Sequence, residues 1–243
     1  MYDNNWQQAF DKIQSLNAVQ SAVLPYLIQS RSNLLVCAPT GAGKTIIALL
    51  AILQELLKNN VISTNNKVVY LAPMKALASE VVGGLTARLK PLQISVCEFT
   101  GDQHLSSEEL EKTNVIVSTP EKWDILSRKS LERPIVDQLT LLIIDEVHLL
   151  GDSRGGIIES IAYRAMQSSF TRIIGLSATL PNPKDVGSFL KVPEDGLFLF
   201  GSEYRPIPLS LKLMGISEKG KLKQAEKINE LLFMIKLSHR LIF

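Results

Sequence analysis

The stretch LLVCAPTGAGKT, residues 34–45, decides the fold class of this chain. Its apolar run LLVC is typical of a buried strand, and the segment that begins at Lys44 has the pattern of a helix. Between them, Gly41 and Gly43 let the backbone turn so that its amides point inward toward one anion. The positive end of the helix adds to this preference. A plain glycine turn between a strand and a helix is the alternative.

The loop APTGAGKT (38–45) follows the phosphate-loop pattern G-x-x-x-x-G-K-[ST], except that Ala38 stands in place of the first glycine. In this pattern Lys44 reaches the β- and γ-phosphates, and the Thr45 hydroxyl is offered to Mg²⁺. We therefore expect a nucleotide site formed by the residues of this loop, namely Pro39, Thr40, Gly41, Ala42, Gly43, Lys44 and Thr45.

A second apolar run, LTLLIID (139–145), ends in the carboxylates Asp145 and Glu146. The carboxyl ends of parallel strands border the crevice where such sheets bind ligands. We expect Asp145 to hold Mg²⁺ through water and Glu146 to orient or deprotonate the attacking water. Two acids alone would be weak evidence for a nucleotide site, since a solvated strand end is the alternative. Here, however, they follow a phosphate loop in the sequence. The loop is therefore interpreted as an ATP site.

Short β-branched runs alternate with helix-like segments along the chain. Strands are predicted at 34–38, 67–72, 94–99, 114–119, 139–145 and 172–177. Helices are predicted at 44–58, 74–89, 120–129 and 156–169, and a capping box at Ser106 and Glu109 predicts a short one over 106–112. Most of the strands are apolar at consecutive positions, which is typical of strands covered on both faces. The pattern predicts an α/β fold, a three-layer sandwich with a mainly parallel central sheet.

Composition places few limits on function. The chain has 46% hydrophobic and 21% charged residues, as in ordinary globular proteins, and its net charge of +2 neither favours nor excludes a polyanionic partner. Cys37 and Cys97 lie in apolar runs without metal-ligand spacing, so we expect buried free thiols in a reducing compartment. We expect neither a signal peptide nor a membrane helix.

The pattern changes at RPIPL (205–209), where two prolines punctuate the chain. A strand-like stretch and a charged amphipathic helix, KLKQAEKINELLFMIKLS (221–238), follow. We therefore expect one domain over 1–208 and a linker with the beginning of a second, truncated domain over 209–243.

Seven motifs give the chain a family resemblance. In order they are LNAVQS (16–21), APTGAGKT (38–45), APMKALASE (72–80), FTGDQ (99–103), STPEKWD (118–124), DEVH (145–148) and LSATLPN (176–182). This ordered set resembles the first RecA-like domain of superfamily-two helicases of the Ski-type class. TPEKWD and the pairing of SATLPN with RPIPL are typical of the subgroup of large spliceosomal helicases and their relatives. Phe99 stands where these proteins tend to have leucine, and we expect no functional consequence.

The resemblance implies roles for individual residues. Gln20 would read the adenine edge, for which a side-chain amide offers both a donor and an acceptor; a helix-surface glutamine is the alternative. The loops at 73–76, 100–102 and 119–122 would bind phosphates of a nucleic-acid strand. The implied strand contacts are Pro73, Lys75, Ala76, Thr100, Gly101, Asp102, Thr119, Pro120, Glu121 and Lys122. Ordinary solvated helix charge is the alternative for the two lysines.

Other positions carry weaker implications. His148, Ser177 and Thr179 would couple the nucleotide state to the grip on the strand, although a small-residue turn is the alternative for the last two. Trp123 can stack on a base, but we expect it to pack in the core. Arg154 and Glu159 also match the family pattern. For Arg154, a phosphate or domain contact and a structural salt bridge are equally compatible with the sequence.

The resemblance thus implies the ATP-binding half of an ATP-dependent nucleic-acid helicase that uses ATP and Mg²⁺. Its partners would be single-stranded RNA or DNA, with RNA favoured, a second RecA-like domain that supplies arginine fingers, and a larger ribonucleoprotein or repair complex. The segment HRLIF (239–243) resembles the first strand of that second domain. We expect an intracellular location, nuclear or cytoplasmic, of which the resemblance favours the nucleus, and no membrane contact. An inert helicase-like cassette and a phosphate-loop ATPase of another class are the competing readings.

Overall fold

The structure is a computed structural model that describes residues 4–10, 13, 15–58, 61–62, 66–101, 105–129, 133–209, 215–217 and 220–238. It divides into two compact units, Met1–Ile207 and Pro208–Phe243. The second unit contains helix α10 (Lys221–Ser238), which covers the predicted amphipathic segment. The predicted strands after RPIPL fall largely on residues 210–214 and 239–243, which lie outside the described residues.

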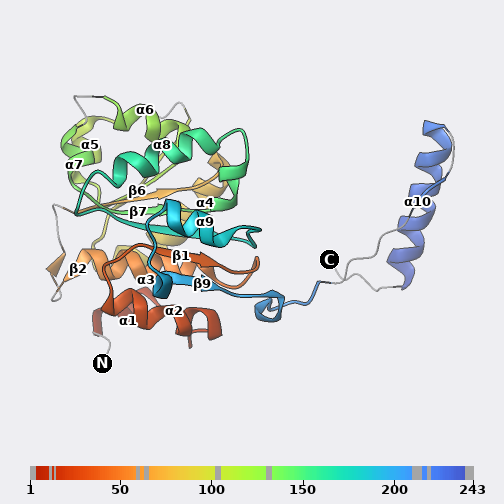
Figure 1. Cartoon of the computed structure of the whole chain (residues 1–243), viewed down its shortest axis with the longest axis horizontal. Coiled ribbons are helices and arrows are strands. Elements are labelled where there is room, and N and C mark those ends of the chain that lie inside the picture. Colours follow the sequence, from red (N-terminus) through yellow and green to blue (C-terminus); the bar gives the residue numbers. More distant parts are fainter. Residues whose placement is uncertain are drawn as a thin grey trace. The chain divides into compact units, whose positions relative to one another are not determined.

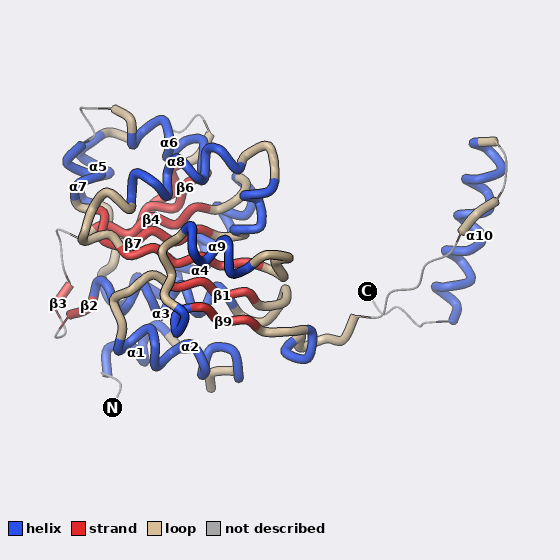
Figure 2. Tube along the Cα trace, viewed as in Figure 1, coloured by secondary structure: helices blue, strands red, loops and turns tan. Residues whose placement is uncertain are grey.

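The first unit is built on one sheet whose seven described strands are all parallel (Figures 1 and 2). Its strands are β1 (Leu34–Cys37), β4 (Lys67–Leu71), β5 (Val96–Phe99), β6 (Val115–Ser118), β7 (Leu139–Ile144), β8 (Arg172–Ser177) and β9 (Leu197–Leu199). Across the sheet they run in the order β5-β6-β4-β7-β8-β1-β9. A separate antiparallel hairpin joins β2 (Leu57–Lys58) to β3 (Val61–Ile62).

Helices cover both faces of this sheet (Figure 1). One face packs against α2 (Ala18–Gln29), α3 (Lys44–Leu56) and α4 (Lys75–Leu89), with α1 (Asn4–Ala9) and η1 (Lys90–Leu92) beside α4. The other face carries α5 (Ser107–Lys112), α6 (Pro120–Ser127), α7 (Arg133–Asp137), α8 (Gly155–Ala165) and α9 (Pro183–Phe189). The remaining described elements are the 3-10 turns η3 (Val147–Gly151), η4 (Glu194–Gly196) and η5 (Ser202–Tyr204).

The two cores follow from the strand period of two. In β1, Leu34 and Val36 face the first core, whereas Leu35 and Cys37 face the second. All four are buried, so the run reads as apolar at every position. Because both faces need helices, the sheet is the middle layer of the predicted three-layer sandwich.

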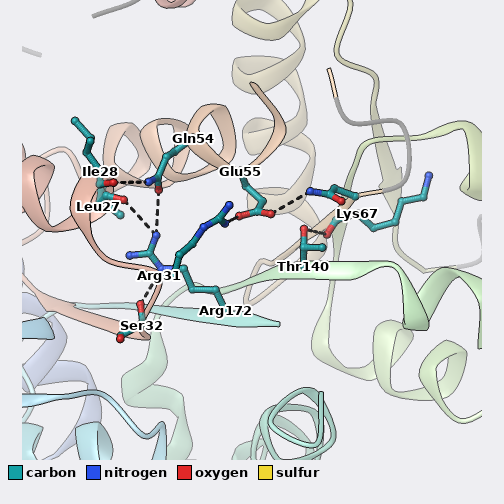
Figure 3. Close-up of polar contacts among 10 residues, drawn as sticks. Leu27, Ile28, Arg31, Ser32, Gln54, Glu55, Lys67, Thr140 and Arg172 are labelled. Carbon is teal, nitrogen blue, oxygen red and sulfur yellow. Dashed lines mark hydrogen bonds and ion pairs between the residues drawn. The ribbon is translucent and has the colours of Figure 1, made fainter. Parts of the chain in front are cut away.

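Polar side chains, among them the buried Arg172, join helices to the sheet at the edge where its strands begin (Figure 3). Arg172, the first residue of β8, donates to the carbonyl oxygens of Ser32 (2.8 Å) and Leu27 (3.4 Å) and to Oε1 of Gln54 (3.1 Å). Burial lowers the pKa of its guanidinium to about 10, so the group remains a cation at neutral pH. These bonds join the end of α2 and the end of α3 to β8.

The sequence predicted most of the long elements and missed most of the short ones. All six predicted strands are present, with ends within two residues of the predicted ones, and the α/β fold is confirmed. Strand β9, the β2–β3 hairpin, α1, α2, α7 and α9 were not predicted. Cys37 is buried as expected, but Cys97 is only half-buried; both are free thiols.

Among the described helices, none combines the length and the apolar character that crossing a membrane requires.

Candidate functional site

The strand order brings the motifs together along one edge of the sheet. Because the seven strands of this sheet are parallel, their carboxyl ends lie on the same side, and six of the seven predicted motifs begin at the end of a strand; LNAVQS instead leads into α2. From β5 to β1 the edge carries FTG, TPEK, PMKA, DEVH, SAT and the phosphate loop. The predicted strand contacts therefore follow β5, β6 and β4, the predicted nucleotide residues other than Gln20 follow β7 and β1, and the predicted coupling residue Ser177 ends β8 between them.

The phosphate loop has the backbone that an anion cradle needs. Gly41 and Gly43 adopt the left-handed conformation, with φ of 86° and 85°, which glycine adopts without steric cost. Gly43 is the N-cap of α3 and leaves the first amides of that helix without a side-chain cap. The Lys44 ammonium donates to the Ala38 carbonyl oxygen at 3.0 Å, so its charge lies inside the loop.

Helix α2 braces this loop through Asn17 and Gln20. The two residues form a capping box, and their amides donate to the carbonyl oxygens of Ala42 (2.9 Å) and Gly43 (3.3 Å). A Cβ atom at Gly43 would lie 2.2 Å from Nε2 of Gln20, so only glycine leaves room for the bond. Gln20 is 6% exposed, so the helix-surface alternative is wrong. Sequence reasoning missed Asn17, although N-x-x-Q before an apolar helix is a capping signal.

The acidic pair directly follows β7, beside a buried tyrosine of β4. The Tyr70 hydroxyl donates to Oδ2 of Asp145 at 2.7 Å, and the Glu146 amide donates to Oδ1 of the same carboxylate at 3.0 Å. Burial raises the pKa of Asp145, and the bond from Tyr70 opposes that shift. Nothing in the sequence marks Tyr70, because it looks like any buried strand residue.

Glu146 has an unfavourable backbone conformation, and one of its carboxylate oxygens has no hydrogen-bond partner among the described residues. Its φ of 53° is left-handed, which costs free energy for a residue with a side chain, and such strain gathers at functional sites. Its Oε2 atom is buried and accepts no hydrogen bond among the described residues. Nδ1 of His148 lies 3.3 Å from that atom, without hydrogen-bond geometry. A buried carboxylate oxygen kept free is what a water-activating base requires.

Ser177 lies between the two groups of nucleotide residues. It ends β8, which separates β1 from β7, and its carbonyl oxygen accepts a hydrogen bond from the Ala38 amide at 3.1 Å. Its hydroxyl is fully buried and has no hydrogen-bond partner within the described part of the chain. Thr179 is exposed just beyond it.

The predicted strand contacts form a second region on the same edge. Helices α4 and α6 both begin there, and neither has a side-chain cap, so their first backbone amides have no side-chain partner at the cap. Lys75 and Ala76 are exposed at the start of α4. Lys122 donates to the Gly101 carbonyl oxygen at 2.8 Å, and its ammonium lies 4.9 Å from the centre of the Phe99 ring.

Some predicted contacts are less accessible than the sequence suggested. The rings of Pro73 and Pro120 are buried, and Thr100 is fully buried with its hydroxyl bonded to Glu98. These positions offer backbone rather than side-chain groups. Asp102 lies outside the described residues. Trp123 is 1% exposed and packs in the second core, as expected, so it does not stack on a base.

Arg154 lies at the beginning of α8 and makes internal contacts. Its Nη1 atom donates to the Pro73 carbonyl oxygen, and its Nε atom lies 3.3 Å from Oε1 of Glu121. Of the two alternatives left by the sequence, the structure therefore shows the salt bridge. Glu159 is exposed on α8.

The residues present fit a nucleotide triphosphate with Mg²⁺. The glycine cradle, the uncapped start of α3 and Lys44 supply groups for phosphates. The Thr45 hydroxyl and the Asp145 carboxylate supply the hard oxygen donors that Mg²⁺ prefers. The class of protein that this fold and site define is the phosphate-loop nucleoside triphosphatase of the RecA-like α/β type.

Comparison with known proteins narrows the class. The pattern of the DEAD/DEAH box helicase family matches residues 17–186, so the chain belongs to that family. It is 49% identical to the DExH-box ATP-dependent RNA helicase DExH12 of Arabidopsis thaliana, 46% to the pre-mRNA-splicing factor brr2 of Schizosaccharomyces pombe, and 43% to the human U5 small nuclear ribonucleoprotein 200 kDa helicase. These alignments cover 94–96% of this chain but only 11% of each relative.

Solved structures show the same fold. The DUF1998 helicase MrfA bound to DNA and AMPPNP superposes with a TM-score of 0.68 at 22% identity, covering 85% of this chain and 30% of that one. A hypothetical ATP-dependent RNA helicase from Sulfolobus tokodaii gives a TM-score of 0.63 at 21% identity, covering 82% and 57%. At these identities the likeness supports the fold alone.

Proposed function

We propose that this chain is the ATP-binding, first RecA-like domain of an ATP-dependent helicase that acts on RNA. One observation carries the proposal: the nucleotide motifs and the strand-contact motifs lie side by side along one sheet edge, with Ser177 between the phosphate loop and the acidic pair. Such an arrangement lets the state of a nucleotide alter the grip on a strand. The names of the similar proteins, which describe an RNA helicase and a pre-mRNA-splicing factor, favour RNA over DNA as the substrate.

Each residue of the nucleotide half has a role in this proposal. The bound Mg²⁺ would neutralise phosphate charge, held by Thr45 and, through water, by Asp145. Lys44 would leave the Ala38 carbonyl for the phosphates, and the free oxygen of Glu146 would take the proton of the attacking water. Reading of adenine by Gln20 requires its amide to exchange the Gly43 carbonyl for the base.

The strand half is proposed to bind phosphates rather than bases. Its accessible groups are backbone amides at two helix starts and the exposed Lys75, none of which distinguishes one base from another. We further propose that residues 1–208 are this domain and that 209–243 are a linker with the start of a second RecA-like domain. A ribonucleoprotein or repair complex in the nucleus is the proposed setting.

Titrations of the chain with two unrelated single-stranded RNAs at several salt concentrations test the strand half. We expect affinities that differ little between sequences and fall linearly with salt on logarithmic axes. The same titrations with a fluorescent ATP analogue test the nucleotide half. Strong base preference, or ATP binding that Lys44→Ala leaves unchanged, would contradict the proposal.

An inert cassette that only binds partners is the second candidate. It predicts that the hydrolytic groups have been replaced or engaged elsewhere. Lys44, Thr45 and Asp145 are intact, and the Oε2 atom of Glu146 is kept without a hydrogen bond. These features favour an active site over an inert one.

A further inference from the structure

The Arg154 side chain joins two of the predicted strand-contact loops. Its guanidinium bonds the Pro73 carbonyl oxygen in the loop after β4 and pairs with Glu121 in the first turn of α6. The next residue of α6, Lys122, bonds the Gly101 carbonyl oxygen in the loop after β5. Together these contacts fasten the three loops to one another, and Arg154 supplies the contact from outside them.

A short rigid segment connects Arg154 to the acidic pair. Backbone hydrogen bonds follow one another along it, from the Leu149 amide to Glu146 O (3.0 Å), from Asp152 to Leu149 O (3.0 Å) and from Gly155 to Asp152 O (2.9 Å). The segment packs so tightly on α8 that a Cβ atom at Gly155 would lie 2.1 Å from the Leu150 carbonyl oxygen. A displacement of Glu146 would therefore also displace Arg154.

A second connection, through β4, also links the acidic pair to Arg154. Tyr70 bonds Asp145, and three residues further along the chain, in the loop after β4, lies Pro73, whose carbonyl oxygen accepts a hydrogen bond from Arg154. The chain path from Asp145 through η3 to Arg154, across to Pro73 and back along β4 to Tyr70 is thus a closed ring. Two polar contacts complete this ring, one from Tyr70 to Asp145 and one from Arg154 to the Pro73 carbonyl oxygen. A substitution at Tyr70 or at Arg154 therefore removes one of them.

The charge of Glu121 gives Arg154 a further task. Glu121 is 41% exposed at an edge where we propose that a polyanion binds, and an unpaired carboxylate there would repel phosphates. Arg154 neutralises it. Its Nη1 and Nε atoms face Pro73 and Glu121, so two of the three guanidinium nitrogens are engaged within the protein.

We propose that Arg154 is a positioning residue that couples the Asp145–Glu146 pair to the strand-contact loops without itself contacting the strand. This inference rests on the proposed function. It assigns to the arginine after DEVH a transmitting role additional to that proposed for Ser177 and Thr179. Its loss should weaken the coupling between strand binding and ATP hydrolysis more than it weakens either binding step.

The test compares Arg154→Ala with Arg128→Ala in a longer protein that joins this chain to its second RecA-like domain. Arg128 is a matched control, because it is an exposed arginine that also pairs with one carboxylate, Asp124, but lies at the opposite end of α6 from Glu121. The readouts are the stimulation of ATP hydrolysis by single-stranded RNA, RNA affinity as a function of salt, and thermal unfolding. Wild-type protein without any RNA stimulation would refute the proposed function itself, whatever the variants do.

We expect Arg154→Ala to lower the stimulation by about 2- to 30-fold, the range typical of residues between coupled sites. The salt slope, measured in a Glu121→Gln background so that no unpaired carboxylate is left to repel phosphates, should stay at the value without the Arg154 substitution, and Arg128→Ala should change neither quantity. A direct phosphate contact by Arg154 would instead reduce the slope by about 1, and that result would overturn the proposal. Unchanged stimulation in a folded Arg154→Ala protein would also overturn it.

Arg154→Lys keeps the test decisive if the alanine variant does not fold. Lysine retains the charge but lacks the planar fork that reaches two acceptors at once. We expect intermediate stimulation with the wild-type salt slope. Full wild-type stimulation in Arg154→Lys would show that charge alone suffices and would refute the two-point contact.

Discussion

Substitution of Tyr70 by phenylalanine removes one oxygen atom from the centre of the site. The phenol is fully buried, and its hydroxyl donates to Oδ2 of Asp145 at 2.7 Å. Phenylalanine fills the same space, so no cavity forms. The loss is therefore one hydrogen bond to a charged group, worth about 1.5–3 kcal/mol. At 1.36 kcal/mol per decade, a loss of about 2 kcal/mol corresponds to roughly 30-fold in binding.

We expect this loss to appear as a higher Mg²⁺ requirement, because Tyr70 fixes the orientation of the carboxylate proposed to hold the metal. The assay titrates Mg²⁺ against binding of a fluorescent ATP analogue to the chain. Half-saturation should move upward by as much as about 30-fold, and excess Mg²⁺ should restore nucleotide binding. The control is Tyr26→Phe, which also removes a hydroxyl bond, here to the Asn33 carbonyl oxygen at 3.1 Å. Equal Mg²⁺ requirements in Tyr70→Phe, Tyr26→Phe and wild type would refute the reasoning.

The same variant has a signature in pH. Burial raises the pKa of Asp145 above its ordinary value of 3.8, and the Tyr70 hydrogen bond lowers it. Stability from protonating Asp145 is thus present below pH 3.8 and is lost as pH rises through the folded pKa. Tyr70→Phe should raise that pKa further, so Mg²⁺-dependent binding should fail at a higher pH on acidification than in wild type.

Three other outcomes follow from the site. Gln20→Ala should relax a preference for ATP over GTP in competition binding; equal binding of both by wild type would remove the adenine-reading role. Lys44→Ala should weaken nucleotide binding, whereas Glu146→Gln should preserve it and stop hydrolysis; an unchanged hydrolysis rate in Glu146→Gln would refute its role as base. Burial raises the pKa of both Cys37 and Cys97 from 9.0 to about 11, so alkylation at neutral pH should be about 100-fold slower than for an ordinary thiol and rise with pH. Rapid labelling of both thiols at neutral pH would contradict that burial.

The sequence predicted the sheet because its strands are buried on both faces and so read as continuous apolar runs. Such runs are visible without knowledge of what covers them. Strand β9 (Leu197–Leu199) is three residues long, and only its pairing with β1 makes it a strand. The order of the strands, which places Ser177 between the phosphate loop and Asp145, was not predicted either.

The candidate site was predictable where function fixes residue type and spacing along the chain, as in the phosphate loop. Contacts between distant segments were not predictable. The bond from Tyr70 to Asp145 and the contacts of Arg154 with Pro73 and Glu121 depend on which strands are neighbours. Gln20 illustrates both cases. Its motif pointed to the nucleotide site, but its bond to Gly43 appears only when α2 packs beside the loop.

The most direct test of the central claim measures ATP hydrolysis and strand separation by this chain beside a longer protein that includes a second RecA-like domain. The chain alone should bind ATP, separate no strands, and hydrolyse ATP about 10³–10⁵-fold more slowly, because arginine fingers from the second domain are missing. The longer protein should hydrolyse ATP faster when single-stranded RNA is added, and should separate duplexes. Robust unwinding by the chain alone, or hydrolysis by the longer protein that ignores RNA, would contradict the account.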